Sequence, residues 1–208
     1  MEQTLYIILG WLLALLSPRI IDNTKKLYLK NEIRDALFCE LDEIRYTQAF
    51  VIYNLLTTTG KADKNILNRI GTVFKAYKGF YKDEEFIDKF NKFLIKDDSE
   101  LDTSLKGQYD LNVVLSLKRI YTPFLDTQTL SIFSPEFQQI AYDIKRRIRM
   151  INEEISISFE FNMKTFDSSI IGENHERVKD NVTKSYVSIA NMSINLVTSI
   201  DRLLKLKK

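Results

Sequence analysis

The chain has 208 residues, of which 45% are hydrophobic and 28% charged, with only 6 glycines and 3 prolines. This balance suits one compact domain with an appended segment, and so few turn residues disfavour β-sandwiches and barrels. The net charge of +2 comes from 30 basic and 28 acidic residues, so the molecule as a whole does not attract nucleic acid or acidic lipid. A single cysteine, Cys39, and a single histidine, His175, leave little material for metal or nucleophilic catalysis.

The strongest signal is an apolar run near the N-terminus. Every residue from Leu5 to Leu16 is apolar, aromatic or glycine, and the run resumes with Ile20 and Ile21. A helix from Thr4 to Ile21 rises about 27 Å, close to the hydrocarbon thickness of a bilayer. The run lacks the polar face of an interfacial helix and the basic start of a signal peptide. We therefore expect a membrane anchor over residues 1–21; the alternative is a helix buried in a soluble fold or an oligomer. The expected anchor residues are Leu5, Ile7, Ile8, Leu9, Trp11, Leu12, Leu13, Leu15 and Leu16.

The residues around and within this run predict its orientation and packing. Four cations follow it, whereas Glu2 is the only charged residue before it. The cations are Arg19, Lys25, Lys26 and Lys30. Because positive residues stay on the cytoplasmic side, we expect a single-pass protein of the cell (inner) membrane, with its N-terminus outside and its body in the cytoplasm. Small residues at steps of four and three predict a face on which two such helices pack closely. They are Gly10, Ala14 and Ser17.

Residues 22–208 are expected to form a helical body, separated from the anchor by a break at Pro18. Apolar residues at helical spacing predict helices from about residue 22 to Gly60, from Asp63 to Gly79 and from Asp83 to Leu94. The two aspartates are suited to cap the helices that they precede. Residues 96–107 are acidic and lack an apolar face, so we expect an exposed loop there, followed by a buried helix over residues 111–121.

Two long helices are predicted in the C-terminal third. Ser134 and Pro135 suit the cap and first position of a helix that reaches about Phe166. Residues 155–161 alternate as a half-buried strand would, but no partner strand follows and we expect helix. A break at Gly172 precedes a last helix to about Leu206, and a short turn places two long helices antiparallel. The predicted fold is all-α: a short N-terminal hydrophobic helix, residues 1–21, and an elongated antiparallel helical bundle, residues 22–208.

Motifs for catalysis are missing from the sequence. No glycine-rich phosphate loop and no Gly-x-Ser-x-Gly element occurs, and no motif links Cys39 to His175. His175 is expected to be a solvated residue of a helix's first turn, the alternative being a pH switch or a ligand beside carboxylates. We expect no catalytic residue, no metal, no cofactor and no enzymatic activity.

The densest group of basic residues lies on the first long C-terminal helix. It consists of Lys145, Arg146, Arg147 and Arg149. Such a group is able to contact phosphates of nucleic acid or anionic lipid, and the alternative is an ordinary charged helix face. Since the protein is near neutral overall, we do not expect a nucleic-acid partner, and no small-molecule substrate is evident.

These features together predict a non-enzymatic, membrane-tethered helical module. Its expected partners are membrane lipid and either another protein or further copies of the same chain. The alternative function is a membrane-acting effector, in which the N-terminal helices assemble in the bilayer under the control of the helical body.

Overall fold

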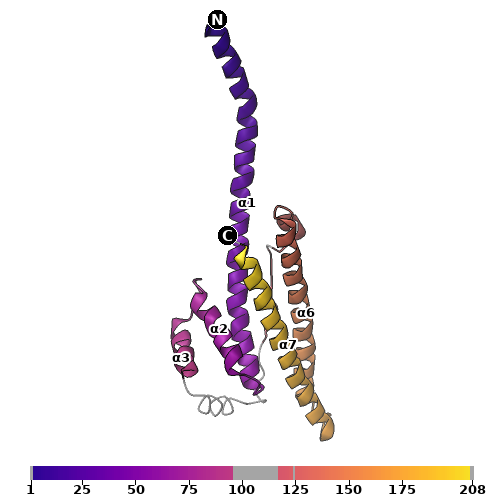
Figure 1. Ribbon diagram of the computed structural model, residues 1–208. Helices are drawn as coiled ribbons and strands as arrows, with labels where there is room; N and C mark the ends of the chain where they lie inside the picture. The colour runs from indigo at the N-terminus through magenta and orange to yellow at the C-terminus, as the bar shows by residue number, and fades with distance from the viewer. Residues whose placement is uncertain (1, 96–116, 124, 207–208) are drawn as a thin grey trace. The chain divides into compact units, whose positions relative to one another are not determined.

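Figure 1 shows the computed structural model, which describes residues 2–95, 117–123 and 125–206, with side chains from residue 23 onward except at 26, 29 and 128. The chain divides into two compact units, Met1–Phe38 and Cys39–Lys208. All regular structure among the described residues is α-helical, which confirms the predicted all-α class. The expected domain boundary between residues 21 and 22 stays a prediction.

The first unit consists of the beginning of α1, which runs from Glu2 to Thr58. The helix continues through Pro18, so the expected break at this residue is wrong. A proline removes one backbone hydrogen bond, and the leucines and alanine that precede it are strong helix formers that offset the loss. Among the residues whose side chains the structure describes, none belongs to a helix long and apolar enough to cross a membrane. The side chains of the expected anchor, Leu5 to Leu16, lie outside the described residues, so the anchor stays a prediction.

Two shorter helices follow, α2 (Lys64–Ala76) and α3 (Glu84–Leu94), and both begin as predicted. Asp63 Oδ1 accepts a hydrogen bond from Ile66 N at 2.9 Å, and Asp83 Oδ1 accepts one from Phe86 N at 2.9 Å. These bonds satisfy amide groups that have no partner within the helix. The two predicted caps are therefore confirmed.

Aromatic side chains join α2 and α3 to the part of α1 that belongs to the second unit. The Phe50 ring lies 4.6 Å from that of Phe74 in α2 and 4.6 Å from that of Phe86 in α3. The Tyr46 ring stacks on Tyr77, with centroids 3.9 Å apart. Large rings bury much apolar surface, and this cluster forms one half of the core.

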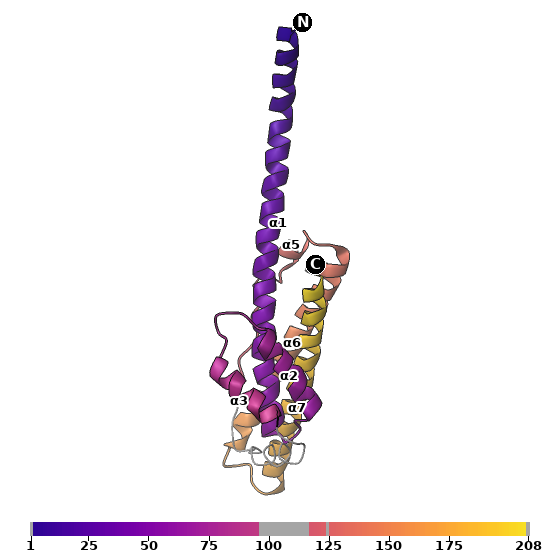
Figure 2. The ribbon, with the colours of Figure 1, turned by 60° about the vertical axis from the view of Figure 1, so that its left-hand side comes forward.

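The other half of the core lies between α6 (Pro135–Thr165) and α7 (Glu173–Lys205), which run antiparallel and side by side in Figures 1 and 2. Ser134 Oγ accepts from Phe137 N at 3.4 Å and Pro135 occupies the first turn, as predicted. Residues 155–161 are helical, as predicted. Gly172, with φ of +62°, precedes the first turn of α7, a conformation that favours glycine.

Polar pairs join α1 to α7 within the second unit. Ser193 Oγ donates to Gln48 Oε1 at 2.8 Å, and both side chains are buried. Arg45 donates to Asp201 at 2.8 Å and pairs with Asp42 at 2.8 Å. A buried polar group is tolerated when it is hydrogen-bonded, so these pairs fix the register of the two helices. The helical bundle is thereby confirmed.

One predicted element is not formed as expected. Residues 117–122 are irregular rather than helical, which contradicts the C-terminal part of the helix predicted over 111–121. Residues 111–116 and the predicted acidic loop over 96–107 lie outside the described residues. A short helix, α5 (Thr127–Leu130), stands between the irregular segment and α6, and Asp126 caps it through Thr129 N at 2.8 Å.

Candidate functional site

A hollow lined by four cations lies between α6 and residues 119–122, and we call it the basic groove. Its volume is about 770 Å³. Its lining residues are Arg119, Ile120, Tyr121, Thr122, Tyr142, Lys145, Arg146, Ile148, Arg149, Asn152, Glu153 and Ser156. Three of the four basic residues singled out in the sequence therefore lie together, and Arg119 joins them from a distant part of the chain.

Asn152 holds one wall of the groove in place. Its side-chain amide donates to Ile120 O at 2.9 Å, and its carbonyl oxygen accepts from Ile120 N at 2.8 Å. The side chain thus pairs with both backbone groups of one residue, as a neighbouring strand would. One turn further along α6, Ser156 Oγ accepts from Arg119 Nη2 at 2.8 Å. Residues 119 and 120 are therefore fixed against the helix despite having no regular structure.

The cations of the groove differ in how far they are already neutralised. Lys145 forms no ion pair with any described residue, and its side chain is exposed. Arg149 lies 3.7 Å from Glu153, and both side chains are largely exposed, so this pair is weak. Arg146 donates to Asp143 at 2.8 Å. The groove therefore offers Lys145, Arg149 and the remaining donors of Arg119 to an anion.

Arg147, the fourth residue of the predicted cluster, does not line the groove. Its Nε donates to Asp143 Oδ2 at 2.7 Å, and the same oxygen accepts from Ser199 Oγ of α7 at 3.1 Å. Burial alone would raise the pKa of Asp143, but hydrogen bonds from Arg147, Arg146 and Ser199 outweigh it and hold the pKa below its usual range. Arg147 thus helps to join α6 to α7.

Arg119 and Tyr121 were missed by sequence reasoning. They lie in a segment whose apolar residues suggested a buried helix, and Arg119 is remote in sequence from the cluster on α6. The contact that brings them to the groove depends on Asn152, 32 residues away from Ile120. No local pattern marks such a contact, so only the tertiary structure reveals it.

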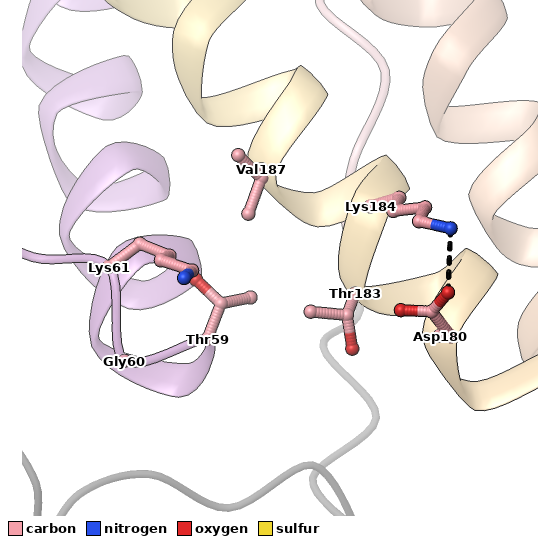
Figure 3. Close-up of a pocket in the computed structure, with 7 residues that line it drawn as sticks. All are labelled: Thr59, Gly60, Lys61, Asp180, Thr183, Lys184 and Val187. Carbon is pink, nitrogen blue, oxygen red and sulfur yellow. Dashed lines mark ion pairs between the residues drawn. The ribbon is translucent and has the colours of Figure 1, made fainter. Parts of the chain in front are cut away.

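Figure 3 shows a second hollow of about 740 Å³, lined by residues from the end of α1 and from α7. Its lining residues are Thr59, Gly60, Lys61, Asp180, Thr183, Lys184 and Val187. The ion pair drawn in the figure joins Lys184 Nζ to Asp180 at 2.6 Å, which neutralises one of the two cations. The hydroxyls of Thr59 and Thr183 each donate to a backbone carbonyl one turn earlier, at 2.7 and 3.1 Å, so this hollow offers fewer available polar groups than the basic groove.

The other candidate site residues from the sequence, where their side chains are described, lie outside the two hollows. Lys25 and Lys30 are exposed on α1, and Cys39 is exposed. His175 is half-buried rather than solvated, and its Nε2 lies 3.1 Å from Thr165 O at the end of α6. Side chains of the predicted packing face, Gly10, Ala14 and Ser17, and of Arg19 and Lys26 lie outside the described residues. Among described side chains no group of three or more His, Cys, Asp or Glu is able to hold a metal ion.

Comparison with known proteins gave no match. No family model, no curated protein and no solved structure resembles the chain significantly.

Proposed function

We propose that the chain is a membrane-tethered helical module that binds a protein partner through an apolar patch beside the α6–α7 turn. The observation that carries this proposal is a set of exposed apolar side chains, which we call the tip patch: Phe159 (64% exposed), Met163 (55%), Phe166 (69%) and Ile171 (75%). Phe159 and Met163 lie four residues apart on α6, and Phe166, three residues later, is the C-cap residue of that helix, so the three lie toward one side of its last turns. Clustered apolar side chains of this size on a folded surface are typical of an interaction site.

The charges around the tip patch favour a protein partner over a bilayer. Glu160, Asp167, Glu173 and Glu176 outnumber the nearby cations Lys164, Arg177 and Lys179. Arg177 pairs with Glu173 and Lys179 with Glu176, so Glu160 and Asp167 contribute most of the remaining negative charge. An acidic rim repels the anionic headgroups of a membrane surface. It attracts a protein surface that has an apolar centre and basic residues around it. Such a surface, on another protein or on a second copy of this chain, is the partner that we propose.

The tether rests on the apolar run of the sequence. A substitution of Leu12 by arginine puts a charge near the middle of this run, which costs roughly 2.5–3.5 kcal/mol in a bilayer. We expect the wild-type chain to stay with membranes after a carbonate wash and the Leu12→Arg chain to be released. Leu27→Arg, at a residue that is 64% exposed, is the matched control and should behave as wild type. Release of the wild-type chain would contradict the tether.

The partner is tested by photo-crosslinking in native membranes. A photoreactive residue in place of Met163 should give one discrete adduct, whose mass distinguishes a second copy from another protein. The same residue in place of Lys184, an exposed position outside the tip patch, is the control and should give none. Phe159→Asp combined with Phe166→Asp should abolish the adduct. If Met163 yields no discrete adduct, the tip patch is not an interaction site.

A further inference from the structure

The tip patch does not explain the basic groove, where three sources of positive charge meet two exposed aromatic rings. We propose that the basic groove binds a nucleotide, with its phosphate on Lys145 and Arg149 and its base on the ring of Tyr121. Lys145 has no described ion pair, and Arg149 has only the long contact of 3.7 Å with Glu153. A phosphate that binds these two side chains therefore displaces no described ion pair at Lys145 and only a weak one at Arg149.

Arg119 adds a further cation to the lining of the groove. Its Nη2 is oriented by Ser156 Oγ at 2.8 Å, which leaves the other guanidinium N–H groups to donate elsewhere. A guanidinium held in this way presents a planar fork that matches two phosphate oxygens. Arg119 is held beside Ser156, about two turns along α6 from Arg149, so it adds positive charge at the end of the groove away from Lys145.

Tyr121 supplies the surface for a base. The side chain is 83% exposed, although the preceding residue is held by both hydrogen bonds of Asn152. An exposed ring on a fixed backbone stacks on a flat ligand with little ordering cost. Tyr142 also lines the groove and is partly exposed. Aromatic rings interleaved with cations are the pattern that binds unpaired bases.

The shape and charge of the groove favour a small ligand over a polymer or a bilayer. A volume of about 770 Å³ lies within the range of small-molecule sites. Two of the cations already face carboxylates, Arg146 at Asp143 and Arg149 at Glu153, whereas a nucleic acid follows an extended basic stripe. Glu153 in the lining and Asp143 beside Arg146 also repel the anionic headgroups of a bilayer.

The test is equilibrium dialysis of the full chain in detergent micelles with labelled adenosine monophosphate. Ribose 5-phosphate and orthophosphate serve as competitors. We expect adenosine monophosphate to bind at least tenfold more tightly than orthophosphate. Lys145→Ala combined with Arg149→Ala should weaken it by tenfold or more. Tyr121→Ala should lower the affinity for adenosine monophosphate to that for ribose 5-phosphate. The affinity for ribose 5-phosphate itself should not change. The control, Arg177→Ala combined with Lys184→Ala, removes two exposed cations outside the groove and should change nothing.

Three results would overturn the proposal. They are no binding of adenosine monophosphate at millimolar concentration, unchanged binding by the Lys145/Arg149 double variant, and binding only to a single-stranded oligonucleotide or to vesicles of anionic lipid. Circular dichroism of each variant verifies that the helices are intact. The groove variants should still be retained by membranes and crosslinked at Met163, so failure here is distinguishable from failure of the proposed function.

Discussion

Asp143 is the residue at which α6 meets both its own cations and α7. Its carboxylate accepts hydrogen bonds from Arg146, Arg147 and Ser199 at the same time. Because the pKa of Asp143 is lowered in the folded chain, its stabilising effect is complete above the unfolded pKa of about 3.9 and is lost as the pH falls through the folded pKa. We expect Asp143→Asn to reduce the free energy of unfolding by about 1–3 kcal/mol at pH 7. Urea denaturation from pH 7 to pH 3 should show this difference shrinking below about pH 4; a constant difference would contradict it.

Gly79 is required because the ring of Tyr77 lies across it. A Cβ atom at this position would overlap the Tyr77 hydroxyl and ring. The ring is buried and stacked on Tyr46, so it moves only by breaking that contact. We expect Gly79→Ala to lower the free energy of unfolding by about 1–3 kcal/mol. Lys78→Ala, at the exposed neighbouring residue, should stay within about 0.5 kcal/mol of wild type in the same denaturation experiment.

At the scale of the element, local signals were predictable and distant ones were not. The caps Asp63, Asp83 and Ser134 were recognised because a capping side chain and its helix are adjacent in sequence. The segment 117–122 was predicted to end a helix, but it is irregular, and both backbone groups of Ile120 bond to the side chain of Asn152 on α6. Because this contact joins residues far apart in the sequence, the sequence did not predict that Arg119 and its neighbours form one wall of the basic groove.

The alternation within α6 shows why a sequence pattern can point to the wrong structure. The small Ser158 is buried in α6, whereas its apolar neighbours Ile157 and Phe159 are exposed. A pattern that resembles a half-buried strand therefore arises from a helix whose small residues face inward and whose apolar residues form part of its surface. Phe159 follows the buried Ile151 and Ile155 at helical spacing, yet it is exposed and belongs to the tip patch. Tertiary packing rather than periodicity decides which of these residues is buried.

Asn152 is the residue on which the irregular segment depends. We expect Asn152→Ala to leave Ile120 N and Ile120 O without their partners and to release the segment from α6. The free energy of unfolding should fall by about 1–3 kcal/mol. In hydrogen exchange, the Ile120 amide should lose its protection while the amides of α6 keep theirs. Glu153→Ala is the neighbouring control. Unchanged protection of Ile120 in the Asn152 variant would show that other contacts hold the segment.

At the scale of the whole molecule, the proposed orientation is testable with the native cysteine. Cys39 is the single cysteine of the sequence and is exposed. With the body in the cytoplasm, a membrane-impermeant maleimide should label it only after the cells are permeabilised. In a Cys39→Ser chain, a cysteine in place of Gln3 should be labelled on intact cells, since the N-terminus is expected outside. The opposite labelling pattern would mean that the orientation is reversed.

The hydrogen bonds between α1 and α7 also have a consequence for synthesis on the ribosome. Gln48 and Ser193 are separated by 145 residues, and Arg45 and Asp201 by 156. At about 5–20 residues per second, roughly 7–30 s pass between the emergence of the first partner and that of the last. During this interval the core face of α1, which includes Leu41, Ala49 and Leu55, has no α7 to cover it. The nascent chain therefore depends on a chaperone, a nearby surface or its own transient contacts until its final residues are made.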